Sequence, residues 1–356
     1  MDKLYKTAHY TSIGLYQNFG IIGVGSKQIL IDDRRLWENV SLILHEWLLA
    51  NTKENMERIM ACKDSFHHEK IKEAFDIVYN NNLIMQHNVF DSSDRYSRNF
   101  LYFAHEGANP FFVQENLKNS AVTIIGCGGI GNHIAAILAT AGVGQIHLVD
   151  NDVIEISNLT RQILFSENDI NQSKIEILCK ELHKRNSEIK ITTQNLNIKS
   201  ENDILKLHRS DLYILSADTP NNLIHYVNSA CIKKQQAYIN VGYINDISTF
   251  GPFYIPKITA CFNCAQYTPD NTNQDPFHQI IHDIENNFRP ATYAPINGVA
   301  AMYASADIIR YLGKFGEILS KNKRIGIHFN TLKVEEQIFS INKDCLCQQS
   351  LPYQKH

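Results

Sequence analysis

The sequence predicts an α/β protein built around a doubly wound, mostly parallel sheet, preceded by a small N-terminal α+β module. From Ala121 onward, short apolar runs alternate with segments whose apolar residues recur at helical spacing. Strands that alternate with helices in this way form parallel sheets. Before that point, short β-branched runs come first and helical segments follow, an order typical of a compact winged-helix-like module.

The composition is that of a soluble globular protein with two or three domains. The chain has 356 residues, and a domain usually holds about 100 to 200. Hydrophobic residues make up 44% and charged residues 20%, which excludes the disordered, collagen-like and disulfide-scaffold classes. The net charge of −3 gives no reason to expect nucleic acid or a membrane as partner. Without a signal peptide or a bilayer-spanning run, we expect a cytoplasmic protein with reduced cysteines.

Residues 1–88 form the predicted N-terminal domain. The runs at 13–15, 21–24 and 29–31 predict a small antiparallel sheet. Helical spacing follows within 34–51, 54–62 and 67–79. Residues 1–90 hold 10 Lys or Arg and 11 Asp or Glu, so the basic face of a DNA-reading winged helix is not expected. A polar linker at 89–100 then leads into the second domain, residues 89–356.

The second domain repeats a strand, a turn and a helix. Its predicted strands are 121–125, 145–150, 190–194, 211–218 and 237–243, with two late strands within 325–341. Its predicted helices include 173–184, 221–234 and the strongly apolar 297–312.

A glycine cluster follows the first of these strands and opens a helix. It contains Gly126, Gly128, Gly129 and Gly131, and Asp150 ends the next strand. Glycines let the backbone approach a phosphate closely, while the helix N-terminus offers free N–H groups and a partial positive charge. A carboxylate at Asp150 can accept hydrogen bonds from a ribose. The same pattern serves dinucleotides, so NAD binding stays an alternative here, as does a merely tight turn.

Polar and charged side chains follow Asp150 closely. The candidate nucleotide contacts are Asp152, Asn158, Arg161, Gln162 and Lys174. Two cations near a nucleotide suit a triphosphate, whose charge must be offset as pyrophosphate leaves, whereas a dinucleotide has no terminal charge. As isolated residues, Arg161 and Lys174 would instead be solvated surface groups. No hydride-transfer residues are evident, which disfavours an oxidoreductase.

Asp218 lies in the string SAD, where a further strand ends. Ligands of open α/β sheets bind at this carboxyl edge, and an acid there can hold Mg²⁺ against phosphate oxygens. Capping of the following helix explains Asp218 equally well.

Four cysteines form two close pairs, in CFNC and in CLC near the C-terminus. Thiolates of Cys261, Cys264, Cys345 and Cys347 suit a tetrahedral structural Zn²⁺ that ties the tail to the domain. The one-residue spacing of the second pair strains a shared metal, so unliganded thiols are the alternative. The other four, Cys62, Cys127, Cys179 and Cys231, are predicted to be core residues.

Together these motifs resemble the ThiF and MoeB-like adenylating enzymes, which are related to ubiquitin-activating enzymes. The resemblance covers residues 95 to about 341 and rests on RYSRNF, GCGGIGNH, VDND, SNLTRQ, SAD and CFNC. It implies that the glycine loop binds ATP, Asp150 binds the ribose, and Asp218 holds Mg²⁺. It also implies that Asn158, Arg161 and Lys174 hold the triphosphate. Arg98 matches an arginine that reaches the phosphates of the partner subunit in a homodimer.

Further strings, including LWEN, GANP, TRQILFSE and FGPFY, resemble the branch of peptide-modifying adenylyltransferases of microcin C and pantocin biosynthesis. In that branch the N-terminal domain is a clamp for a short ribosomal precursor peptide, whose activated carboxylate gives a nucleotide-linked or internally cyclised product. The alternative substrate is the C-terminus of a ubiquitin-like sulfur-carrier protein. The resemblance leaves open which carboxylate is activated.

The resemblance also places a crossover loop near the active site, at about 266–290. We expect this segment to act as a lid or to be disordered. No cysteine lies between Ala265 and Asp344, so an enzyme thioester is not expected. His278 and His282 are interpreted as a solvated helical turn. The family has CxxC in both cysteine pairs, a pattern from which this chain departs.

Overall fold

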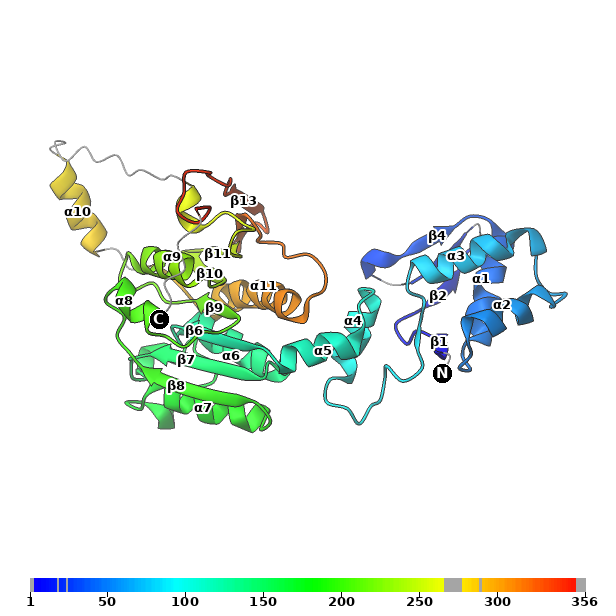
Figure 1. Cartoon of the computed structure of the whole chain (residues 1–356), viewed down its shortest axis with the longest axis horizontal. Helices are drawn as coiled ribbons and strands as arrows, with labels where there is room; N and C mark the ends of the chain where they lie inside the picture. The colour runs from blue at the N-terminus through cyan, green and yellow to red at the C-terminus, as the bar shows by residue number, and fades with distance from the viewer. Residues whose placement is uncertain (1–2, 18, 24, 266–276, 288–289, 350–356) are drawn as a thin grey trace. The chain divides into compact units, whose positions relative to one another are not determined.

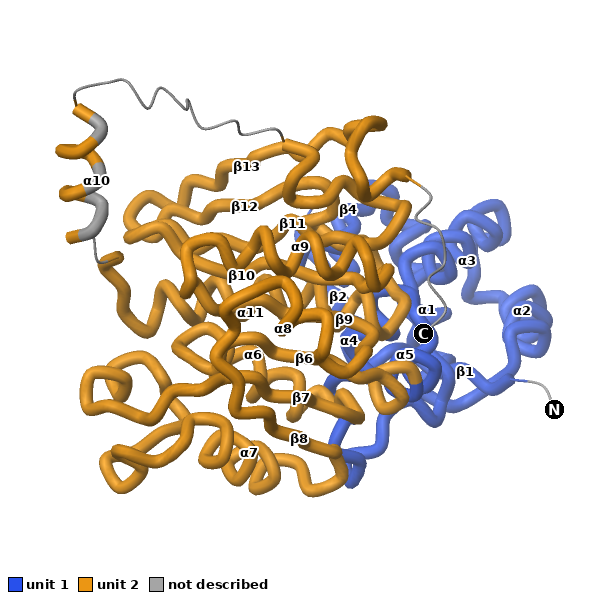
Figure 2. Tube along the Cα trace, turned by 60° about the vertical axis from the view of Figure 1, so that its left-hand side comes forward, with its two compact units in different colours: residues 1–115 blue, residues 116–356 orange. Residues whose placement is uncertain are grey.

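The computed structural model describes residues 3–17, 19–23, 25–265, 277–287 and 290–349. The chain divides into two compact units, Met1–Glu115 and Asn116–His356 (Figure 2). This division falls later in the chain than the domain boundary predicted at residue 88. The assignment of a clamp role to 1–88 and an adenylation role to 89–356 stays a prediction.

Unit 1 combines two small sheets with helices. Strands β2, β3 and β4 pair antiparallel in that order, and β1 pairs antiparallel with β5. The strands are β1 (Tyr5–Thr7), β2 (Ile13–Leu15), β3 (Gly20–Ile22), β4 (Ile29–Ile31) and β5 (Ile84–Gln86). The helices are α1 (Arg34–Glu46), α2 (Lys53–Ala61), α3 (Ile71–Asn80) and α4 (Ser97–His105), with short 3₁₀ turns at Gly25–Lys27 and His68–Lys70 (Figure 1). Helix α5 (Pro110–Lys118) begins in unit 1 and ends in unit 2.

The core of unit 1 forms around α1. Asp33 caps this helix, because its side chain accepts hydrogen bonds from the backbone N–H groups of Arg35 and Leu36. One face of α1 is buried, and Trp47, directly after the helix, is fully buried. The expected order of a small sheet followed by helices is confirmed. The helix predicted within 34–51 ends at Glu46, and the chain turns at Trp47.

Unit 2 is built on one sheet of eight strands. The strands are β6 (Ala121–Ile125), β7 (Gln145–Asp150), β8 (Lys190–Asn195), β9 (Leu212–Leu215), β10 (Tyr238–Ile244), β11 (Ile247–Tyr254), β12 (Lys323–His328) and β13 (Val334–Ile338). The helices are α6 (Gly129–Ala141), α7 (Lys174–Arg185), α8 (Glu201–Leu205), α9 (Leu223–Lys234), α10 (His278–Asn287) and α11 (Ala294–Gly313), with 3₁₀ turns at Ile156–Asn158, Glu167–Asp169 and Phe262–Cys264.

The sheet order β13-β12-β11-β10-β9-β6-β7-β8 is doubly wound. The five strands from β10 to β8 are parallel, and β11 to β13 add an antiparallel extension. The chain runs outward from β6 through β7 to β8, then returns to β9 and continues outward to β10. The order in which strands are added to the sheet therefore reverses between β6 and β9, and open α/β sheets bind their ligands at such a switch point. The predicted fold class is confirmed, and β11 is a strand that the sequence analysis did not predict.

Helices cover both faces of this sheet. Helices α6, α7 and α11 pack together on one face, and α8 and α9 pack together on the other. The largest buried residues include Tyr213, Tyr238 and Tyr254, which lie on three neighbouring strands. Among the helices that the structure describes, none combines the length and the apolar character that a bilayer span needs.

Candidate nucleotide site and cysteine cluster

The carboxyl ends of β6 and β9 lie side by side and place the glycine loop beside the SAD string. Gly126 donates its N–H to Val149 O at 2.9 Å, and Ser216 donates its N–H to Ile125 O at 2.9 Å. Gly126 has a φ of +92°, and a β-carbon there would lie 2.6 Å from Cβ of Ala217. Only glycine fits this position, because it tolerates both the left-handed backbone and the close contact.

The remaining loop glycines differ in what surrounds them. Gly128 is the N-cap of α6, and a β-carbon on it would meet no atom within 4 Å. Gly129 packs against Asn297 and Arg161, at 2.5 Å and 3.3 Å from its would-be β-carbon. The open space at Gly128 therefore lies in front of the first turn of α6, whose N–H groups have no intrahelical partners. This is the arrangement that binds phosphate groups.

Asp150 holds the loop from the neighbouring strand. Its carboxylate accepts hydrogen bonds from the backbone N–H groups of Cys127 at 2.6 Å and Asp152 at 2.9 Å. The side chain thereby fixes the turn at the end of β7 relative to the glycine loop. Each carboxylate oxygen has two lone pairs, so capacity for ribose hydroxyls remains.

Lys174 and Asp152 form an ion pair at the start of α7. The Lys174 Nζ lies 2.7 Å from Oδ2 of Asp152, and the Lys174 side chain is 8% exposed against 58% for Asp152. The backbone supports the pair, since Lys174 also donates its N–H to Asp152 O at 3.1 Å. Lys174 is therefore a buried cation whose ammonium group is held by Asp152, and not the solvated surface group of the alternative interpretation.

The 156–162 segment carries the other predicted contacts. Asn158 is buried, and its side-chain oxygen accepts a hydrogen bond from Glu155 N at 3.2 Å. Gln162 is 2% exposed, and its Oε1 has no hydrogen-bond partner among the described residues. Arg161 is half-buried, donates to Ser157 O at 3.1 Å, and lies against Gly129. Arg161 is thus near the glycine loop, whereas Asn158 and Gln162 are buried within the segment that carries Arg161.

Asp218 is exposed beyond the end of β9. Its carboxylate accepts a hydrogen bond from the Thr219 hydroxyl at 3.3 Å. The N-cap of α9 is Asn222, so the alternative that Asp218 caps this helix is wrong. An exposed carboxylate at this edge has the oxygen chemistry that Mg²⁺ prefers.

Arg98 lies in unit 1 on α4. Its side chain is exposed, and its guanidinium lies over the ring of Phe90, 5.5 Å from the centroid. An exposed arginine on a helix is available to a second molecule, and its role stays a prediction.

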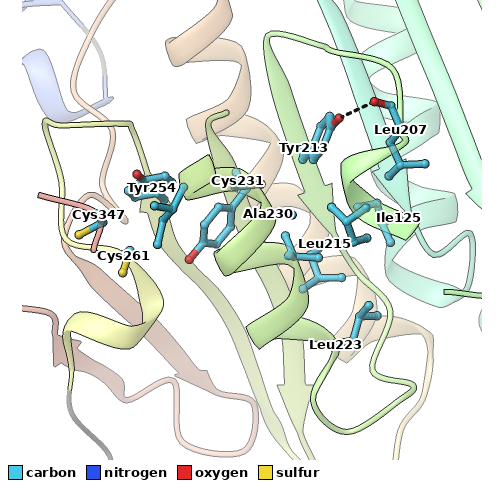
Figure 3. Packing of buried hydrophobic residues seen from close by; sticks show 14 of the residues in the cluster. Ile125, Leu207, Tyr213, Leu215, Leu223, Ala230, Cys231, Tyr254, Cys261 and Cys347 are labelled. Carbon is cyan, nitrogen blue, oxygen red and sulfur yellow. Dashed lines mark hydrogen bonds between the residues drawn. The ribbon is translucent and has the colours of Figure 1, made fainter. Parts of the chain in front are cut away.

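The four cysteines predicted to bind zinc come together, with their sulfur atoms within 4.8 Å of one another. Figure 3 labels two of them, Cys261 and Cys347. The Sγ atom of Cys261 lies 3.8 Å from that of Cys264 and 3.5 Å from that of Cys345, and the Sγ atoms of Cys264 and Cys347 are 3.4 Å apart. Four thiolates around Zn²⁺, each about 2.3 Å from the metal, would lie about 3.8 Å from one another. The tight CLC pair therefore does not prevent a four-sulfur site, and the residues fit zinc.

The cluster sits at one end of the unit 2 core, beside Tyr254 (Figure 3). Burial, followed by the three neighbouring thiols, raises the pKa of the Cys261 thiol well above its usual range. Uptake of a metal must therefore release protons from these groups. Gln348 donates from Nε2 to Cys347 Sγ at 3.3 Å, which orients this ligand.

The other cysteines only partly follow the prediction that they are core residues. Cys127 and Cys231 are buried, as expected. Cys179 is only partly buried, and Cys62 is exposed at the end of α2, so the prediction is wrong for Cys62. The end of α2 lies on the surface, a placement that residue type alone does not reveal.

Much of the predicted crossover loop lies outside the described residues, including 266–276 and 288–289. Its described part is α10, where the predicted helical turn is found, but the side chains of His278 and His282 are also outside the described set. The His133 side chain is buried, and its Nδ1 lies 2.7 Å from Gly129 O in the first turn of α6.

Two buried asparagines at this site were not predicted. The Asn132 side-chain oxygen accepts a hydrogen bond from Leu164 N at 3.1 Å and so holds the 158–165 segment to α6. Asn297 reaches the glycine loop from α11. Asn132 lies within the glycine motif, where its position on the helix was a usable signal. Asn297 is distant in sequence and carried no local signal.

Comparison with known proteins gives a consistent set of relatives. Residues 96–349 match the model of the ThiF family. The structure of E. coli MccB with ATP shares 40% identity at a TM-score of 0.89, over 97% of this chain and 100% of that chain. The structure of the microcin C7 biosynthetic enzyme MccB in complex with N-formylated MccA shares 39% identity at a TM-score of 0.90, over the same shares of both chains.

Curated relatives match over shorter stretches. The sulfur carrier protein ThiS adenylyltransferase of Escherichia coli (strain K12) is 31% identical over 226 residues, which are 61% of this chain and 80% of that protein. This chain spans only 33% of the length of the probable molybdopterin-synthase adenylyltransferase of Porphyra purpurea. It spans 26% and 53% of the adenylyltransferase and sulfurtransferase MOCS3 of Xenopus laevis and of Caenorhabditis briggsae.

Proposed function

The chain belongs to the ThiF family, and from this premise we propose that it is an ATP-dependent adenylyltransferase acting on a carboxylate of a short ribosomal precursor peptide. The observation that carries the proposal is the glycine loop at the β6–β9 reversal, open at Gly128, in a chain that aligns over 97% of its length with MccB. Structures of MccB contain ATP in one case and the MccA peptide in another.

The proposed reaction forms an acyl-adenylate. An oxygen of the peptide carboxylate attacks the α-phosphorus of ATP, the bond from that phosphorus to the bridging oxygen breaks, and pyrophosphate leaves with the electron pair. Carboxylic acids have a pKa of about 4, so the nucleophile is already ionised at neutral pH and no general base is needed. The enzyme's task is positioning and charge stabilisation.

The chain's own residues divide this task. Gly126, Gly128, Gly129 and Gly131 form the phosphate-binding turn, Asp150 binds the ribose, and Asp152, Asn158 and Gln162 shape the pocket. Arg161 and Lys174 offset the charge of the departing pyrophosphate, and Arg98 does so across a homodimer. Mg²⁺ held by Asp218 would neutralise phosphate charge, and Zn²⁺ held by the four cysteines would be structural.

A homodimer is supported by exposed apolar side chains on unit 2. Met302 and Tyr303 on α11 are 56% and 49% exposed, and apolar surface of this kind favours burial against another chain. A reaction that consumes ATP, in a chain whose cysteines form no disulfide among the described residues, fits the cytoplasm.

Unit 1 supplies a surface for the peptide. Within the described residues, β2 and β4 each pair only with β3, so both leave an open edge to which a peptide can add as a strand. Both tryptophans of the chain, Trp37 and Trp47, lie in this unit. Their fluorescence should therefore respond to the precursor peptide more than to ATP. A response to ATP alone would contradict the clamp role.

The decisive experiment incubates the enzyme with Mg–ATP and a short precursor peptide encoded beside its gene. We expect peptide-dependent pyrophosphate release, with a peptide mass that gains a nucleotide monophosphate or loses water. Arg161→Ala and Asp218→Ala should each abolish this release while the peptide still binds. Lys184→Ala, which changes an exposed cation at the other end of α7, is the matched control and should keep full activity. Full activity in both site variants would refute the proposal.

The alternative substrate is the C-terminus of a folded sulfur-carrier protein. It is favoured by the 31% identity to the ThiS adenylyltransferase. The same pyrophosphate assay distinguishes the two substrates. If the alternative holds, a carrier protein triggers pyrophosphate release and the precursor peptide does not.

A further inference from the structure

We infer that Asn297 is a positioning residue of the nucleotide site. Its side chain, held at the start of α11, packs against Gly129 and keeps the glycine loop in place. The inference rests on the proposed function, because it names a further residue of the same site. It is carried by the contact between Asn297 and Gly129 and by the forced orientation of the Asn297 amide.

The contact requires glycine at position 129. A β-carbon on Gly129 would lie 2.5 Å from Oδ1 and 3.0 Å from Cγ of Asn297. The amide of Asn297 therefore occupies the space that any larger residue at position 129 would need. Asn297 is 2% exposed, so its side chain is enclosed at this place and cannot move away into solvent.

The orientation of the amide follows from its hydrogen bonds. The Nδ2 group donates to the Tyr293 carbonyl at 2.8 Å and to the Thr292 hydroxyl at 2.6 Å. A carbonyl oxygen can only accept, so the NH₂ group must face Tyr293 and Oδ1 must face the glycine loop. No described residue donates a hydrogen bond to this oxygen. An acceptor is thus held beside the first turn of α6, where the backbone carries a partial positive charge.

The start of α11 is itself anchored in unit 2. Ala291 donates its N–H to Asn245 Oδ1 at 3.0 Å, and the rings of Tyr293 and Phe329 meet edge to face at 5.3 Å. The Asn297 side chain extends from this anchored segment to the space beside Gly129, where it limits the movement of the loop by close packing. The phosphate-binding N–H groups then stay in place before ATP arrives, which lowers the ordering cost of binding.

The test measures ATP binding by calorimetry in the absence of peptide. Asn297→Ala should weaken ATP binding by about tenfold, because the loop loses the side chain that packs at Gly129 and the start of α11 loses the hydrogen bonds that orient it. Asn297→Asp should weaken it further, because it loses the donor and adds a negative charge beside the phosphates, and added salt should reduce this extra loss. Asn186→Ala is the control, since Asn186 is a buried amide that donates to Ala139 O at the opposite end of α6. It should leave ATP affinity unchanged.

A second measurement uses rescue. Gly129→Ala alone should bind ATP poorly, because its methyl group collides with Asn297. The double variant Gly129→Ala with Asn297→Ala should bind ATP better than Gly129→Ala, since the collision is removed. ATP affinity within twofold of the wild type in Asn297→Ala, or additive losses in the double variant, would overturn the inference. Failure of the proposed function is seen separately, as ATP binding by the wild type without peptide-dependent pyrophosphate release.

Discussion

The backbone of Gly131 packs directly against the carbonyl oxygen of Gly126, so that a β-carbon on Gly131 would lie 2.0 Å from that oxygen. The oxygen is held in place, since it also accepts a hydrogen bond from the Ser216 hydroxyl at 2.8 Å. Gly128 belongs to the same motif but faces open space. One motif thus contains glycines required for packing and a glycine that leaves room for a ligand.

These two kinds of glycine should respond differently to substitution. Gly131→Ala should lower the free energy of unfolding by at least about 2 kcal/mol, because the loop must shift to admit the methyl group. Gly128→Ala should fold normally, since its φ is −72° and no atom opposes the new methyl, but it should lose most of its ATP affinity. Urea unfolding and calorimetric titration test the pair. Equal loss of stability in both variants would contradict this division.

Because only one partner of the ion pair between Lys174 and Asp152 is buried, removing either side chain should lower the free energy of unfolding by a different amount. Asp152→Ala leaves an enclosed ammonium without its carboxylate and should cost about 2 kcal/mol of unfolding free energy. Lys174→Met leaves only a largely exposed carboxylate and should cost less than about 1 kcal/mol. Chemical denaturation of the two variants measures the difference. A larger loss in Lys174→Met would mean that Asp152 does not serve to hold the lysine.

The cysteine cluster predicts one bound zinc per chain. Elemental analysis of purified protein should find it, and Cys347→Ser should lose it together with thermal stability, because the C-terminal tail is then no longer tied to the domain. Cys62→Ser, at an exposed cysteine outside the cluster, should keep both. A chelator should lower the melting temperature of the Cys62→Ser protein but not that of Cys347→Ser. Equal metal content in the two variants would argue against the site.

The environment of His147 in the unit 2 sheet predicts that the stability of the protein falls in acid. Its Nδ1 lies 2.8 Å from the Thr192 hydroxyl, its Nε2 lies 3.2 Å from Gln194 Oε1, and His208 packs on it edge to face. Burial, with a smaller contribution from the charge of His208, lowers the pKa of His147 below its ordinary value of 6.5. The folded state then binds fewer protons than the unfolded state, so stability is complete above about pH 6.5 and falls as the pH drops below it.

Melting temperatures between pH 5 and 7.5 check this expectation. His147→Gln should show a flatter pH dependence than the wild type, while His208→Gln should change it only slightly. An identical pH dependence in the wild type and His147→Gln would assign the acid sensitivity to other groups.

Local patterns were sufficient to predict much of the architecture. The alternation of apolar runs and helical spacing predicted the doubly wound sheet, and the glycine motif predicted the turn into α6, because these features depend on residues within a few positions of one another. Strand β11 was missed, since it follows β10 after a tight turn and reads as a continuation of the same apolar stretch.

The sequence by itself determined the fold class, the glycine loop and the set of polar residues near it, because backbone conformation and hydrophobic periodicity are local properties. Only the tertiary structure decided that Gly131 and Gly128 differ in purpose, that Lys174 pairs with Asp152, and that Asn297 reaches Gly129. It also showed that the two cysteines of CLC lie beside the two cysteines of CFNC and form one four-cysteine cluster. Each of these depends on segments far apart in the chain, whose approach is fixed by the packing of the sheet and its helices and leaves no signal in neighbouring residues.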